Sequence, residues 1–248
     1  MNYIFYDLEF NQNNINTPNN ISVSQLPFEI IQIGALKLDE DLEVISTFNE
    51  FIKPTVYNDI NPYVENITKI TKDMLAKCDT FTSTYNRFIE FLGNEDVILC
   101  VWGKADLKEF IRNIKFNNLS TEIFPTKYID VQKHTSKFFK LSKGTQIGLK
   151  PAVELLNIDF QENFHNAFYD AFYTSEIYKK IINIDIVPEN YIYVNKNDIK
   201  NTYKNKIDTI SLFKQFNKMY NREMSEEEKS IIKTAYNMGR TKQFLMKN

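Results

Sequence analysis

Two carboxylates stand one residue apart in the apolar stretch YIFYDLEF, residues 3–10. A strand sends alternate side chains to opposite faces, so Asp7 and Glu9 are predicted to point the same way. Two anions held close together in apolar surroundings repel each other and lose hydration unless a cation lies between them. The pair therefore predicts a divalent-metal site. The alternative is a pair of acids at a fraying strand end, solvated or paired with Lys or Arg.

Two further acids stand at the starts of predicted helices. Asp106 follows the apolar run VILCVW, in a first helical turn where side chains project over the carboxyl end of a sheet and the helix dipole favours a carboxylate. Asp170 lies in the first turn of a later helix, five residues after His165. Five helical steps would separate these two by roughly 140°, so we expect His165 in the approach to the helix, its ring free to swing toward the acids. Taken alone, Asp106 is an ordinary helix-start aspartate and His165 a capping or surface residue.

Apolar periodicity predicts the elements that position these residues. The predicted strands are 3–10, 28–38, 43–52, 97–102 and 128–131, and the predicted helices are 71–76, 82–92, 105–114, 148–156 and 167–182, with Thr71 and Thr82 as N-caps. A meander followed by strand–helix units predicts a mixed sheet with helices packed on it. After Pro188 a polar stretch and two helical patterns, 207–220 and 225–239, predict a small extension. We therefore expect one α/β domain over residues 1–187 and a helical C-terminal extension over 188–248.

Composition narrows the class of protein. The 248 residues carry 30 basic and 32 acidic side chains, a formal charge of -2, which indicates neither a basic nucleic-acid coat nor an acidic tail. Cys78 and Cys100 lack metal-ligand spacing and are predicted to be buried thiols in a reducing compartment. The start lacks a signal-peptide pattern and no window holds about 18 consecutive apolar residues, which predicts a cytoplasmic protein.

The chemical motifs together resemble a known family. Asp7-x-Glu9, Asp106 within WGKADLKEF and His165-x4-Asp170 resemble the DEDDh branch of the DnaQ-like (RNase T-like) 3′–5′ exonucleases. EIIQIGALKL resembles the family's second strand, ITKITKDML its post-sheet segment and GLKPAVELLNI the helix before the last motif. The resemblance covers residues 3–184, and DLEFN is most similar to the KapD-type and histone-mRNA 3′-end exonuclease-type members, which often act on RNA. It implies an RNase H-like fold, a mixed five-stranded sheet flanked by helices.

The resemblance also implies a reaction. Phosphodiester bonds of single-stranded RNA or DNA, with RNA favoured, would be hydrolysed from the 3′ end by two Mg²⁺ or Mn²⁺ ions, releasing nucleoside 5′-monophosphates. Asp7 is expected to bridge both ions, and Glu9 and Asp170 to complete the site that holds the attacking water. Asp106 is expected to support the second ion. His165 is the expected general base, because an imidazole titrates near neutral pH.

Substrate contacts are predicted beside these motifs. Single strands are held by stacking as well as by charge, and several aromatic side chains lie near the motifs: Phe10, Phe28, Trp102, Phe168 and Tyr169. Phe10 is the first choice because it follows Glu9, and the predicted substrate-binding set is Phe10, Asn11, Trp102 and Lys104. Many family members have a small residue or threonine where Phe10 and Asn11 stand here. His134 has no acidic motif around it and is expected on the surface.

Two readings from other classes stay open. In the first, the chain is a proofreading or processing subunit of a larger assembly, and residues 207–239 form a docking element or a dimer contact. Alternatively, it is a nucleic-acid-binding module that keeps the fold without catalysis, although all five chemical positions are intact.

Overall fold

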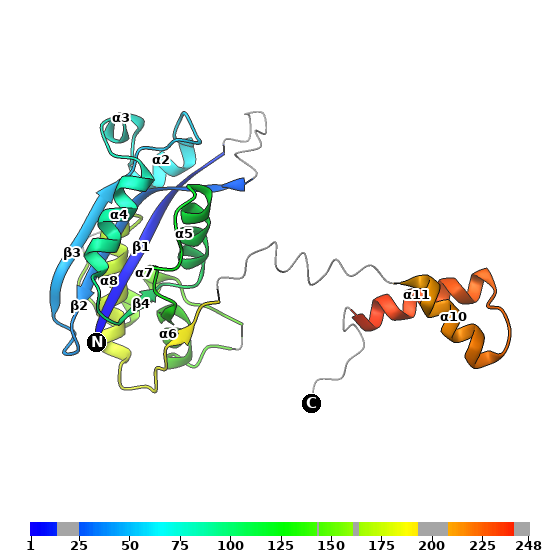
Figure 1. The fold of residues 1–248 in the computed structure, drawn as a ribbon. Coiled ribbons are helices and arrows are strands. Elements are labelled where there is room, and N and C mark those ends of the chain that lie inside the picture. The colour runs from blue at the N-terminus through cyan, green and yellow to red at the C-terminus, as the bar shows by residue number, and fades with distance from the viewer. Residues whose placement is uncertain (14–24, 143, 161–163, 193–207, 241–248) are drawn as a thin grey trace. The chain divides into compact units, whose positions relative to one another are not determined.

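The computed structural model describes residues 1–13, 25–142, 144–160, 164–192 and 208–240, drawn as the coloured ribbon in Figure 1. Contacts within the chain divide it into two compact units, Met1–Tyr193 and Val194–Asn248. The division falls after the last strand, because that strand pairs with the sheet of the first unit. The functional boundary at residue 187 stays a prediction.

The first unit is built on one mixed sheet. Its strands are β1 (Asn2–Gln12), β2 (Phe28–Leu38), β3 (Val44–Phe51), β4 (Val97–Val101), β5 (Lys127–Asp130) and β6 (Glu189–Asn190). Their order is β3-β2-β1-β4-β5-β6, and β4 runs parallel to both β1 and β5, whereas the pairs β1–β2, β2–β3 and β5–β6 are antiparallel. The expected meander and mixed sheet are confirmed, but the sheet has six strands rather than five. The sixth is only two residues long, too short for an apolar pattern to reveal.

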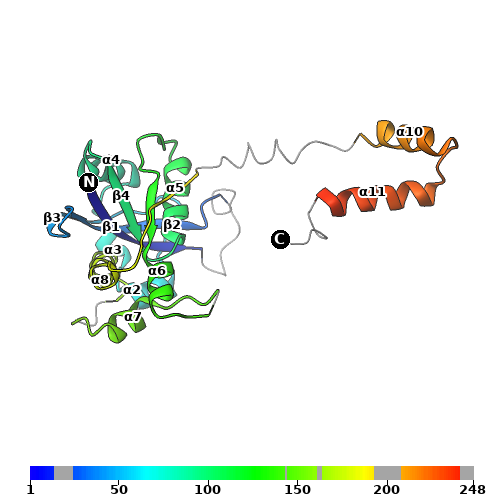
Figure 2. The same cartoon turned by 90° about the horizontal axis from the view of Figure 1, so that it is seen from below.

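Helices cover both faces of this sheet. They are α2 (Pro62–Thr68), α3 (Lys72–Leu75), α4 (Phe81–Leu92), α5 (Ala105–Phe116), α6 (Val131–Phe138), α7 (Leu149–Leu155) and α8 (Ala167–Ile181). One core lies between the sheet and α4 with α5, and a second between the sheet and α6, α7 and α8. Figure 2 shows α7 and α8 on the other side of the sheet from α4 and α5.

Strand β1 separates the two cores by its alternation. Ile4, Tyr6 and Leu8 are buried in the first core, and Phe5 is buried in the second. Side chains two residues apart point the same way, so Asp7 shares the face of Phe5, and the predicted common direction of Asp7 and Glu9 is confirmed. Asp7 and Glu9 lie on the α8 side of the sheet, toward the end of the strand.

Some local predictions were wrong. Thr71 caps α3 through its hydroxyl, as expected, but Thr82 lies inside α4, because the extended backbone that precedes this helix is at Thr80, its N-cap. Helices α2 and α6 were missed: each follows directly on a loop or strand, behind the N-caps Asn61 and Asp130. Cys100 is fully buried as predicted, whereas Cys78 is only half-buried.

The second unit holds two helices where they were predicted, α10 (Thr209–Tyr220) and α11 (Glu226–Arg240). The Asp208 carboxylate caps α10 by accepting the Ser211 amide hydrogen bond. Across the described ranges, no helix combines the length and the apolar character that crossing a bilayer requires.

Candidate active site

The end of β1 presents the first two acids. In the antiparallel pairing, Asp7 lies opposite Gly34 and Glu9 opposite Gln32, and the register shifts just after Glu9. Glu9 is 9% exposed. The irregularity places Phe10 opposite Ile30, so the ladder shifts register directly after the second carboxylate and then continues to Gln12.

The start of α8 supplies the third acid. Asn166 is the N-cap and accepts a hydrogen bond from the Phe168 amide. His165 precedes the helix with φ of +65°, and its backbone N–H donates to Asp170 Oδ2 at 3.2 Å. Asp170 is 9% exposed, and its other oxygen, Oδ1, is buried without a hydrogen-bond partner among the described residues. The predicted position of His165, in the approach to the helix, is confirmed, and its side chain is exposed.

A glycine brings the helix against the strand. A Cβ on Gly34 would lie 2.1 Å from the Phe168 nitrogen and 2.2 Å from the Ala167 carbonyl carbon. The first turn of α8 therefore rests directly on β2, opposite Asp7. This approach brings Asp170 to the carboxylates of β1.

Gln32 fixes the same turn in place. Its side chain is fully buried; its Oε1 accepts the Ala167 N–H at 3.2 Å, and its Nε2 donates to Asn49 at 2.9 Å and to Asn166 at 3.4 Å. The sequence reasoning named neither Gly34 nor Gln32. Their only signals are a glycine and a lone amide inside an apolar strand, and their partner lies more than 130 residues away in the chain.

Three carboxylates converge as a result. One oxygen each from Asp7, Glu9 and Asp170 lies within 4.8 Å of the others. Asp106, in the first turn of α5, lies outside this group, yet its charge raises the pKa values of Asp7 and Glu9. The four predicted acids thus form one site, three in a tight cluster and one beside it.

Burial raises the pKa of all four carboxyl groups, and neighbouring acids raise those of Asp7, Glu9 and Asp106 further. Desolvation, followed by the charges of Asp106, Asp170 and Glu9, raises the pKa of Asp7 well above its usual value. Desolvation and neighbouring acids raise the pKa of Glu9 to about 8 and that of Asp106 to about 7. Desolvation raises the pKa of Asp170 to about 7. Without a cation, the cluster cannot hold its full charge at neutral pH.

This donor set fits a hard divalent cation. Carboxylate oxygens are the ligands that Mg²⁺ and Mn²⁺ prefer, and Asp170, one of the three acids, has a buried oxygen without a hydrogen-bond partner among the described residues. A cation there would compensate the repulsion and satisfy the unpartnered oxygen.

The predicted substrate-binding residues are less uniform. Phe10 is half-buried, with its ring centroid 6.1 Å from that of Phe28. Asn11 is fully buried; its Nδ2 donates to the Asp59 carbonyl at 3.0 Å, and its Oδ1 accepts the Asn61 N–H at 2.9 Å. Both polar atoms of Asn11 therefore anchor the loop before α2, and this placement disfavours a role in holding substrate.

The two candidates after β4 both lie against other parts of the protein. Trp102 packs partly buried against the second core, and its indole nitrogen is buried without a partner in the described part of the chain. Lys104 donates to Glu189 Oε2 at 3.2 Å and lies over the Tyr128 ring. Its ammonium is thus paired with a carboxylate from β6, which it shares with Lys133.

His134 is not on the surface as predicted. It is 9% exposed on α6, and burial, followed by the charge of Lys133, lowers its pKa. The helix α6 was not recognised in the sequence, so the inward face of this segment was not recognised either.

Comparison with known proteins shows that the chain is similar to exonucleases. Residues 4–178 match the family model of the RNase T-type exonucleases. The chain is 23% identical over 151 residues to "3′-5′ exoribonuclease 1" of Rattus norvegicus, an alignment that covers 58% of this chain and 44% of that protein. It is 25% identical over 155 residues to "Probable 3′-5′ exonuclease KapD" of Bacillus subtilis, covering 62% of this chain and 73% of that one.

Solved structures agree on the fold. The nuclease domain of 3′hExo, "a DEDDh family member, bound to rAMP", superposes with a TM-score of 0.64 at 21% identity, covering 76% of this chain and 96% of that one. Cell-death related nuclease 4 (CRN-4) superposes with a TM-score of 0.61 at 18% identity, covering 75% and 64%. The chain spans less than half the length of the mammalian relatives it matches. Because the family model covers most of the chain, this protein belongs to the RNase T-type exonuclease family.

Proposed function

We propose that the protein is a metal-dependent 3′–5′ exonuclease that hydrolyses single-stranded nucleic acid, with RNA favoured over DNA, and releases nucleoside 5′-monophosphates. The observation that carries this proposal is the convergence of three carboxylates, two of them on buried residues, one of which has an oxygen without a hydrogen-bond partner among the described residues. Relatives named as exoribonuclease and exonuclease support it.

The residues present would hold two Mg²⁺ or Mn²⁺ ions. Asp7, Glu9 and Asp170 would bind within their shared cluster, and Asp106 would support the second ion from the start of α5. When bound, such ions supply a hydroxide nucleophile at neutral pH and neutralise charge on the phosphate and on the leaving oxygen. The raised pKa values of the acids reflect the cost of ionising them together, which favours binding of a cation over four separate charges.

His165 is the proposed general base. Its exposed ring stands at the approach to α8, while its backbone N–H is bonded to Asp170. The residue is thereby tied to the metal-binding carboxylate by its main chain, and its imidazole stays available to take a proton from water. Phe10, directly after Glu9, is the proposed contact for the terminal base.

The proposal predicts a specific pattern of products. A 5′-labelled single-stranded RNA incubated with Mg²⁺ or Mn²⁺ should shrink progressively from its 3′ end, and a DNA strand of the same sequence should shrink more slowly. EDTA or Asp7→Ala should abolish the ladder. Immediate appearance of short labelled fragments would instead indicate cleavage from the 5′ end or within the strand.

A partner role has one observation in its favour. Within the second unit, α10 buries none of its residues, and Ile210, Met219 and Ile231 are each more than half exposed. Apolar side chains of this kind favour contact with a second copy or another protein. Size-exclusion chromatography with light scattering should then give a mass above that of one chain.

A further inference from the structure

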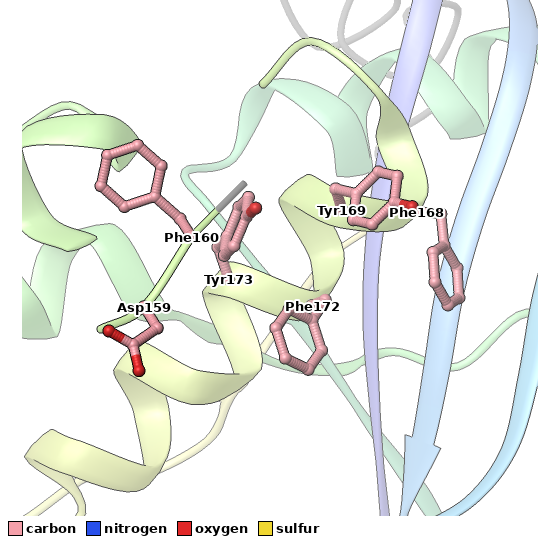
Figure 3. A pocket seen from close by; sticks show the side chains of 6 residues that line it. All are labelled: Asp159, Phe160, Phe168, Tyr169, Phe172 and Tyr173. Carbon is pink, nitrogen blue, oxygen red and sulfur yellow. The ribbon is translucent and has the colours of Figure 1, made fainter. Parts of the chain in front are cut away.

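An aromatic hollow lies beside the helix that carries Asp170. It encloses about 600 Å³ and is lined by Asp159, Phe160, Phe168, Tyr169, Phe172 and Tyr173. Figure 3 shows the four aromatic side chains from α8 along the helix, with Phe160 and Asp159 on the segment that precedes it. The metal-binding acids, His165 and the proposed contact of Phe10 do not use this hollow. We call it the α8 pocket.

The α8 pocket adjoins the catalytic cluster through the first turn of α8. Tyr169 directly precedes Asp170, and the backbone of Phe168 rests on Gly34 opposite Asp7. On a helix, neighbours differ by about 100°, so Tyr169 faces outward while Asp170 faces the cluster. Tyr169 is 37% exposed and Asp170 is 9% exposed, as this rotation requires. The α8 residues that line the pocket all lie within about one helical turn of Asp170.

The lining has the chemistry that nucleobases recognise. The rings of Phe168 and Tyr169 lie 5.8 Å apart, and those of Phe160 and Tyr173 lie 6.5 Å apart. Flat aromatic faces bind bases by stacking, which tolerates any sequence because every base has a π-face. The Asp159 carboxylate, which also lines the pocket, is an acceptor for the amino groups of adenine, cytosine or guanine.

A cation stands beside these rings. Lys150 Nζ lies 5.9 Å from the Phe160 centroid and 5.8 Å from the Phe164 centroid. The residue is exposed, and no salt bridge joins it to a carboxylate in the described ranges. An ammonium next to aromatic rings matches a nucleotide, which joins an aromatic base to a phosphate. An apolar peptide would use the rings and leave this charge without a partner.

We propose that the α8 pocket binds a nucleobase of the single strand upstream of the scissile bond, with Lys150 contacting a phosphate of the same segment. This inference rests on the proposed exonuclease function, since it concerns the same strand. The pocket adds a binding contact beyond the terminal nucleotide. The affinity of the enzyme for a strand should therefore rise once the strand is long enough to reach the pocket.

The test compares strand lengths. KM and kcat are measured for a dinucleotide and for a strand of about ten nucleotides, with wild type, Tyr169→Ala, Tyr169→Phe and Lys150→Ala. Phe138→Ala is the matched control, because that ring is 39% exposed on α6 and outside the pocket. Binding of the longer strand, carrying a fluorophore, is measured in EDTA by anisotropy at several salt concentrations.

Tyr169→Ala should raise KM for the longer strand about tenfold more than for the dinucleotide. Tyr169→Phe should restore wild-type behaviour because it keeps the ring. Lys150→Ala should weaken binding in EDTA and lower the slope of log affinity against log salt by about one. Phe138→Ala should change neither ratio.

Equal effects of Tyr169→Ala on both lengths, or none, would overturn the pocket while leaving the exonuclease intact. If wild type cleaves nothing, the binding arm still decides: a strand that binds in EDTA and loses about tenfold affinity with Tyr169→Ala supports the pocket and refutes the proposed reaction. Unchanged binding in Tyr169→Ala and Lys150→Ala would assign the hollow to another ligand, such as a peptide.

Discussion

Neutralising one acid of the cluster should stabilise the metal-free protein while abolishing its activity. In Asp170→Asn, the amide oxygen still accepts the His165 N–H bond, but the charge that repels Asp7 and Glu9 is gone. At separations of up to 4.8 Å and an effective dielectric constant of about 20, one such repulsion amounts to about 3 kcal/mol.

The raised pKa of Asp170 gives a free energy of similar size. The pKa of Asp170 is raised to about 7, from about 3.9 in an unfolded chain, and three units correspond to about 4 kcal/mol. Because the folded pKa values are raised, folding favours the protonated acids: their contribution is fully present below about pH 4 and is lost as the pH rises through 7 to 8. We therefore expect Asp170→Asn to be more stable than wild type by about 2–4 kcal/mol near pH 8, and about equal to it near pH 4.

Thermal unfolding of EDTA-treated protein measures the difference in stability between Asp170→Asn and wild type. The gain corresponds to a rise in Tm of roughly 5–15 °C near pH 8. Asp73→Asn is the matched control, because Asp73 is an exposed aspartate in a first helical turn, on α3. Excess Mg²⁺ should raise the Tm of wild type and leave that of Asp170→Asn almost unchanged. A variant no more stable than wild type near pH 8 would refute the idea that these acids repel one another in the folded protein.

Three other substitutions test how the site is held. Gln32→Leu should lower the free energy of unfolding by about 1–3 kcal/mol and reduce kcat, because the Ala167 N–H loses its buried acceptor. Chemical denaturation measures the first effect, and steady-state kinetics measures the second. Gly34→Ala should push α8 away from β2 and abolish cleavage, with Gly148→Ala as a control whose new Cβ meets nothing closer than 3.4 Å; unaffected cleavage in Gly34→Ala would contradict the close approach. His165→Asn should lower kcat by about 10²–10⁴-fold without unfolding the protein, because asparagine tolerates the positive φ; a loss of less than tenfold would remove His165 from the role of general base.

Much of the site was predictable because its signals are local. The alternation along β1 gives Asp7 and Glu9 one face without any knowledge of the rest of the fold, and the structure bears this out. The step from His165 to Asp170 forces a break before the helix, which the structure shows as a residue with positive φ followed by the Asn166 cap. Periods of two and of 3.6 residues carry this information within a few residues of chain.

The supporting contacts were not predictable in the same way. Gln32 and Ala167 meet across the fold, and a glutamine in an apolar strand does not indicate its partner. The two-residue strand β6 exists only because β5 offers it an edge, so no pattern marks it. Asn11 likewise anchors a loop near residue 60, a role that depends on where that loop runs. Contacts between distant segments require the three-dimensional fold.

Release of the terminal nucleotide tests the central claim most directly. A single-stranded RNA labelled in its 3′-terminal nucleotide is incubated with wild type or Asp7→Ala, in Mg²⁺ or in EDTA, and the first labelled product is identified. The account predicts a nucleoside 5′-monophosphate from wild type in Mg²⁺ and no release under the other conditions. Release in EDTA, release by Asp7→Ala, or a first product that is a labelled oligonucleotide rather than the mononucleotide would contradict it.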